Sequence, residues 1–258
     1  MEFTANLNKY DSTTGFNIGC VRIYGLEPSV QASGLPLTEE YLQLPYTSEL
    51  DKMERGNITE AHLKHYDRAL RLGKCRQGTG HDCFLQGIIV QMNVTAPRYW
   101  WPELQRYHFV DFVSSMSTMH TIHRKVRAWI KHPELAYQEF SKQVLRTTVE
   151  SYIDLAKSII DLDGMPLSMK KAILKANLPE GYMQTARLTT NYRQLKTIYA
   201  QRKNHALSEW QTFCRWIEQL PMAGDLITGG ESDDAEIGKD IGKDTGSDVV
   251  TYVNRTRG

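Results

Sequence analysis

The chain has 258 residues, 24% of them charged, with a formal net charge of +1 at pH 7. This near-neutral balance argues against general nucleic-acid binders and membrane-surface binders, which carry a clear basic excess. The apolar runs are too short to cross a bilayer, and the N-terminus has no basic-then-apolar signal region. We therefore expect a cytoplasmic protein with one sizeable core and no membrane partner.

Residues 1–228 are predicted to form a single domain. Residues 229–258 are rich in Gly and Asp and repeat Gly-Lys-Asp twice, a composition typical of a disordered acidic tail. The four cysteines have neither zinc-type spacing nor the density of a disulfide framework. We expect them to be reduced and mostly buried thiols. They are Cys20, Cys75, Cys83 and Cys214.

The first third of the chain contains signals for one strand and two helices. Alternating apolar residues predict a strand over 16–24, and Gly and Pro predict a loop over 26–36. Thr38 is a plausible N-cap for a helix. An amphipathic pattern closed by Gly73 predicts a helix over 59–72.

The middle of the chain combines an alternating run with an aromatic segment that carries two arginines. Residues 88–94 alternate as in a half-buried strand. Pro97 is suited to the first turn of a helix, which we predict to continue to Tyr107. Arg98 and Arg106 would then lie a little over two turns apart at similar azimuths, and could point into one cleft.

The last part of the chain is predicted to be mainly helical. The longest helix is expected to start at His132-Pro133 and to run to about residue 162. A short helix is predicted over 167–176 and a strand over 183–190. Asn191 is a good N-cap for the helix that follows it. A further helix is predicted over 206–220.

The clearest chemical signal is a set of basic residues in or beside these ordered segments. Guanidinium groups bind phosphate oxygens with two hydrogen bonds, and lysine supplies a point charge. Taken singly, each is more simply a surface or helix-end cation. No phosphate loop, nucleophile elbow or zinc motif is present, and the helically spaced histidine pairs lack further ligands. The set comprises Arg98, Arg106, Lys175, Arg187, Arg193 and Arg202.

Two stretches resemble the flavin-dependent thymidylate synthase family (the ThyX fold). The first is GHDCFLQG at 80–87, followed by a strand and by two arginines eight residues apart. The second is KANLP at 175–179, Asn191-Tyr-Arg193, Arg202 and HALSE at 205–209. The likeness covers roughly residues 16–221.

The resemblance implies a fold, a reaction and an assembly. The fold would be α+β, with a mixed or antiparallel sheet and long helices. The reaction would transfer a one-carbon unit to C5 of a deoxyuridine monophosphate-type nucleotide. It would use FAD, with methylenetetrahydrofolate and NADPH as co-substrates. The family forms homotetramers with active sites shared between subunits, so we expect self-association.

The resemblance also assigns roles to individual residues, although it assigns no catalytic group. His81, Arg106, Asn191 and Arg193 would hold the flavin and frame its pocket. Lys175 and Arg202 would bind the nucleotide phosphate. Ser115 and Ser117 are the candidates for the substrate-binding serine, since they lie one step on either side of Met116, which occupies the position of the motif serine.

Several positions depart from the family pattern, which makes this a divergent member with a degraded Arg-His-Arg signature. Tyr107 and His108 replace the second and third residues of that signature, and Thr118 replaces an arginine that grips the nucleotide. Loss of two arginines weakens anion binding by orders of magnitude. The alternative function is a non-catalytic paralogue that keeps the fold for nucleotide binding or assembly. A helical interaction protein with an accidental likeness is a third alternative.

Overall fold

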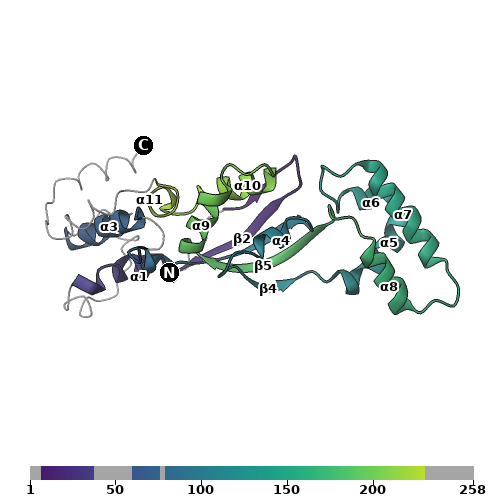
Figure 1. The fold of residues 1–258 in the computed structure, drawn as a ribbon, viewed down its shortest axis with the longest axis horizontal. Helices are drawn as coiled ribbons and strands as arrows, with labels where there is room; N and C mark the ends of the chain where they lie inside the picture. The colour runs from purple at the N-terminus through teal and green to yellow at the C-terminus, as the bar shows by residue number, and fades with distance from the viewer. Residues whose placement is uncertain (1–6, 38–59, 76–78, 230–258) are drawn as a thin grey trace.

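The computed structural model describes residues 7–37, 60–75 and 79–229 (Figure 1). The acidic tail predicted from residue 229 and the helix start predicted at Thr38 therefore lie almost entirely outside the described residues. A five-stranded antiparallel sheet in the order β1-β2-β3-β5-β4 forms the centre of the molecule. Its strands are β1 (Lys9–Tyr10), β2 (Asn17–Tyr24), β3 (Ile89–Pro97), β4 (Asp111–Ser115) and β5 (Met183–Asn191).

The pairing of β3 with β5 is the longest in the sheet and runs without interruption from Ile89↔Asn191 to Pro97↔Met183. Along β3 the buried and half-buried positions alternate, so its apolar side chains face one side of the sheet. By contrast, β4 is an edge strand whose five residues are all exposed. Its pairing with β5 shifts register between Phe112 and Ser114.

Helices cover one side of the sheet and form a separate lobe beyond its end (Figure 1). Those over the sheet are α4 (Trp101–Leu104), α9 (Tyr192–Arg202) and α10 (Ser208–Ile217). At the left of Figure 1, past the other end of the strands, lie α1 (Leu26–Ala32), α3 (Glu60–Gly73) and α11 (Ala223–Leu226). The lobe, at the right of Figure 1, contains α5 (Thr118–Lys131), α6 (Pro133–Tyr137), α7 (Arg146–Ile160) and α8 (Leu167–Ala176). The described residues also contain the short 3₁₀ turns η1 (Leu35–Leu37) and η3 (Cys83–Gly87).

Each part has its own hydrophobic core. Between the sheet, α4 and α10, the ring of Trp100 lies 4.7 Å from that of Trp210 and 5.2 Å from that of Phe16, centroid to centroid. All three side chains are fully buried, so these aromatic rings form the centre of the core between the sheet and the two helices. In the lobe, Trp129 packs against Phe140, Tyr152 and Tyr182.

The predicted strands over 16–24, 88–94 and 183–190 are confirmed as β2, β3 and β5. The helices predicted over 59–72, 167–176 and 206–220 are confirmed as α3, α8 and α10. The side chain of Asn191 accepts a hydrogen bond from the backbone N–H of Gln194 at 2.9 Å, so its predicted N-cap role is confirmed.

Three other predictions are wrong, and two elements were missed. Residues 26–36 are largely helical, as α1 and η1, because the apolar spacing of Leu26 and Val30 outweighs the nearby Gly and Pro. Pro97 ends β3 instead of starting a helix, and α4 begins only at Trp101. The single long helix is divided into α6 and α7, because Phe140 leaves the helical path to bridge Tyr182. Neither β4 nor α5 was predicted.

The cysteines are free thiols, but only two of the four are buried. Cys75 and Cys214 lie in the interior, and burial raises the pKa of the Cys214 thiol to about 12. Cys20 and Cys83 are exposed, which corrects the expectation of mostly buried thiols. Among the described helices, none combines the length and apolar character needed to span a membrane.

Candidate functional site

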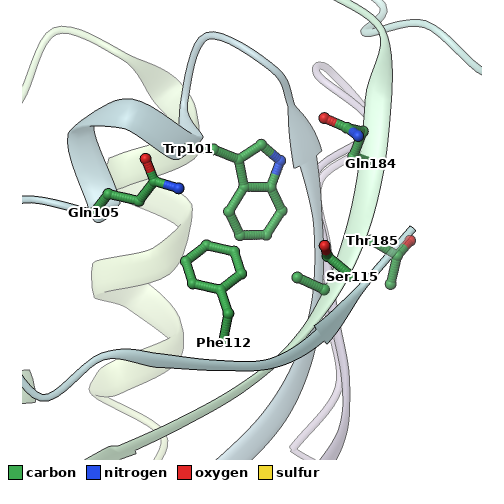
Figure 2. A pocket seen from close by; sticks show the side chains of 7 residues that line it. Trp101, Gln105, Phe112, Ser115, Gln184 and Thr185 are labelled. Atoms are coloured by element: carbon green, nitrogen blue, oxygen red, sulfur yellow. The ribbon is translucent and has the colours of Figure 1, made fainter. Parts of the chain in front are cut away.

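A pocket of about 410 Å³ lies between α4 and the edge of the sheet formed by β4 and β5 (Figure 2). The rings of Trp101 and Phe112 lie 5.4 Å apart at its wall, and the polar side chains face them from the strands and from the end of α4. No charged side chain lines the pocket in the part of the chain that the structure describes, so it suits an uncharged part of a ligand. Its lining residues are Trp101, Gln105, Phe112, Ser115, Gln184, Thr185 and Ala186.

The two predicted serines have different surroundings. Ser115 ends β4, is exposed, and lines this pocket. Ser117 is instead the N-cap of α5, where its hydroxyl accepts a long hydrogen bond of 3.4 Å from the backbone N–H of His120. Of the two, Ser115 is therefore the serine that lines this pocket.

Arg202, at the end of α9, lies in a dense polar cluster with residues of α4 and α10. Its Nη1 donates to Oε2 of Glu103 at 2.8 Å, and its Nε donates to the hydroxyl of Tyr107 at 2.6 Å. The guanidinium also stacks on Trp210, with Cζ 4.7 Å from the ring centroid. Only 14% of the Arg202 side chain is exposed. Its charge is thus already balanced within the chain.

A second ion cluster lies where the turn before η3 meets α9. Asp82 is fully buried, and its carboxylate lies 3.1 Å from Nε of Arg193 and 3.6 Å from Nζ of Lys196. Lys196 is also buried and donates to the carbonyl oxygens of Gly73 and Cys75 at 2.7 and 2.6 Å. The contacts to Asp82 are ion pairs without good hydrogen-bond geometry. Like Arg202, Arg193 has a carboxylate partner within the chain.

Three of the predicted basic or imidazole ligands have no such partner. His81, Arg106 and Lys175 are exposed, and none of their side chains forms an ion pair or hydrogen bond with another described residue. Arg106 follows Gln105, one of the residues that line the pocket. These three side chains are available to bind an anion from outside the chain.

Arg98 is not part of a cleft with Arg106, contrary to the prediction from helical spacing. Its Nη1 donates to the carbonyl oxygen of Leu178 at 2.7 Å, and its Nη2 lies 3.2 Å from the carboxylate of Glu180. The helix assumed for that prediction is absent because the chain turns between β3 and α4. Arg98 therefore links the end of β3 to the turn after α8 through these two contacts.

One chain does not gather all the predicted residues in one place. His81, Asn191 and Arg193 lie together where η3 approaches the start of α9, and Asp82 joins the two segments. Lys175, in contrast, is on α8 in the helical lobe, well away from α9 in Figure 1. A site that uses both groups of residues would need a second copy of the chain.

Several residues of these clusters were not predicted. Glu103 and Asp82 pair with arginines 99 and 111 positions away, so no local spacing reveals them. Glu209 is fully buried and accepts a hydrogen bond from Tyr99; burial and this carboxylate raise the pKa of Tyr99. The available signal was that Asp82 and Glu209 lie inside GHDCFLQG at 80–87 and HALSE at 205–209, the stretches that carry the family resemblance.

Comparisons with known proteins identify the fold. No protein-family model matches the sequence, and no curated protein matches it. The structure is similar to flavin-dependent thymidylate synthase ThyX from Helicobacter pylori complexed with FAD and dUMP, with a TM-score of 0.57 and 17% identity over 83% of this chain and 99% of that chain. For a second structure, of Helicobacter pylori ThyX with FAD and dUMP, the TM-score is 0.53 and the sequence identity is 18%, over 81% of this chain and 96% of that chain. The α+β prediction is confirmed, and the chain has the fold of flavin-dependent thymidylate synthases.

Proposed function

We propose that this protein is a divergent flavin-dependent thymidylate synthase-like enzyme that acts on a pyrimidine deoxynucleotide monophosphate. The fold supports this proposal, since the similar structures contain FAD and dUMP. Because a fold alone does not define an activity, the proposal rests mainly on the side chains. The observation that carries it is the set of exposed, unpaired His81, Arg106 and Lys175 among the described residues.

These side chains fit an anionic cofactor and an anionic substrate. Arg106 and His81 would hold the FAD, with Asn191 and Arg193 at the start of α9 beside it. Lys175 would bind the nucleotide phosphate, and Ser115 would present its hydroxyl from the pocket. Since α8 and α9 lie apart in one chain, the complete site would form between copies of a homotetramer.

In such a site the protein mainly binds and orients its ligands. The flavin, when bound, supplies the redox chemistry, with methylenetetrahydrofolate as one-carbon donor and NADPH as reductant. The aromatic wall of the pocket excludes water from the ligand face that it covers. No described residue is assigned as a nucleophile.

A second candidate function is a non-catalytic paralogue that binds nucleotides or supports an assembly. The observation that favours it is the state of Arg193 and Arg202. Both are neutralised by carboxylates of the same chain, so two family ligands for anions are engaged elsewhere.

Flavin binding separates the two candidates. Purified protein titrated with FAD should show the perturbed visible absorption of a bound flavin. Arg106→Ala should weaken binding about tenfold or more, because a charge-assisted contact is lost. The matched control is Arg124→Ala, which removes another exposed arginine from α5. A colourless wild-type protein with no spectral change would remove the enzyme proposal and leave the paralogue.

A further inference from the structure

Glu103 lies at a point where three N–H groups converge. Its Oε2 accepts from Arg202 Nη1 at 2.8 Å and from Trp210 Nε1 at 2.9 Å, and lies 3.6 Å from Nε2 of His205. Nδ1 of His205 accepts a hydrogen bond from the backbone N–H of Leu207, so the neutral ring carries its proton on Nε2. Three donors directed at one oxygen form the donor set of an anion site.

The surroundings fix these donors without help from Glu103. Arg202 is stacked on Trp210 and also donates to the hydroxyl of Tyr107 at 2.6 Å. Trp210 is fully buried against Trp100 and Phe213. The donors are thus preorganised, which lowers the cost of binding any anion that reaches them.

Glu103 itself is accessible to solvent. Its side chain is 27% exposed, and its three contacts all go to Oε2, whereas Oε1 has no partner among the described residues. Asp82 provides a contrast, since its carboxylate is fully buried between its cations. A solvated anion can therefore approach the position of the Glu103 carboxylate, but not that of Asp82.

We propose that Glu103 is a specificity-determining residue, a resident anion that occupies the Arg202 site and keeps the phosphate of the ligand away from it. The proposal rests on the proposed function for the identity of the ligand. The phosphate then contacts the unpaired Lys175, and Arg202 serves to hold α4 and α10 together. The carboxylate and an incoming phosphate would compete for the same donors, and their like charges repel.

The test compares Glu103→Ala and Glu103→Gln with wild type in calorimetric titrations. The probes are inorganic phosphate, deoxyuridine monophosphate and uncharged deoxyuridine. Glu103→Ala should bind both phosphate-bearing probes at least about tenfold more tightly than wild type does, with no change for deoxyuridine. Phosphate should also raise the Tm of Glu103→Ala more than that of wild type. Glu103→Gln keeps the shape of the side chain and guards against misfolding.

The control is Glu180→Ala, which removes the carboxylate partner of Arg98 in a different part of the fold. It should leave phosphate affinity unchanged. If neither Glu103 variant gains phosphate affinity, the inference is overturned, whatever the wild type binds. If the variants gain affinity for inorganic phosphate but no form binds the nucleotide, Glu103 is confirmed as the resident anion and the proposed function fails.

Discussion

Asp82→Ala is expected to lower the free energy of unfolding by about 3–5 kcal/mol, because it leaves two cations without their buried counter-charge. Asp82 has no exposed surface, and its carboxylate lies between Arg193 and Lys196. Lys196 is only 5% exposed and cannot regain full hydration by a small movement. The two carbonyl oxygens that it contacts offset part of the cost but carry no full charge.

Urea denaturation of wild type and variant measures this loss. The control is Asp67→Ala, which removes the partner of Arg71 at 3.3 Å on the surface of α3, with 41% of the Asp67 side chain exposed. Exposed pairs of this kind contribute between about 0 and 1 kcal/mol. Equal losses in the two variants would show that the Asp82 cluster is solvated in solution and does not join η3 to α9.

Trp210→Ala is expected to cost about 3–5 kcal/mol of stability, the range for truncating a large buried aromatic side chain. Trp210 is fully buried, and its ring contacts Trp100, Tyr107 and Phe213 at centroid distances between 4.7 and 6.0 Å. Its indole N–H also donates to Glu103. The substitution therefore removes packing and a charged hydrogen bond at once.

Two further variants divide these contributions in the same denaturation measurement. Trp210→Phe keeps an aromatic ring but loses the N–H, so it should be clearly less destabilised than Trp210→Ala. Leu162→Ala, at a half-exposed position after α7, should change stability by less than about 0.5 kcal/mol. A Trp210→Ala protein as stable as Leu162→Ala would contradict the aromatic core between the sheet, α4 and α10.

The parts of the fold that could be predicted are those with a local pattern. β3 alternates between apolar and polar positions because one face is buried, and α9 begins at a recognisable N-cap. β4 was missed because it is an edge strand that buries neither face, so its sequence has no alternation. The division between α6 and α7 depends on a bridge between Phe140 and Tyr182, a contact that no short window contains.

The candidate site was predictable in its basic residues but not in their partners. The resemblance selected Arg193 and Arg202, whereas the carboxylates that neutralise them come from distant segments. The prediction that Arg98 and Arg106 point into one cleft also failed. It assumed a helix from Pro97, where the chain instead ends β3 and turns before α4. Whether a cation is free to bind a ligand depends on the tertiary structure. Only the folded chain therefore shows that His81, Arg106 and Lys175 are better candidates for binding an anion than Arg193 and Arg202.

The most direct test of the central claim is a calorimetric titration of the FAD-supplemented wild-type protein with deoxyuridine monophosphate. We expect saturable binding that is about tenfold to a hundredfold weaker in Lys175→Ala, because one charged contact to the phosphate is lost. Lys157→Ala, another exposed lysine of the helical lobe, should bind as wild type does. The absence of binding by wild type, or equal affinity in all three proteins, would contradict nucleotide recognition at this site.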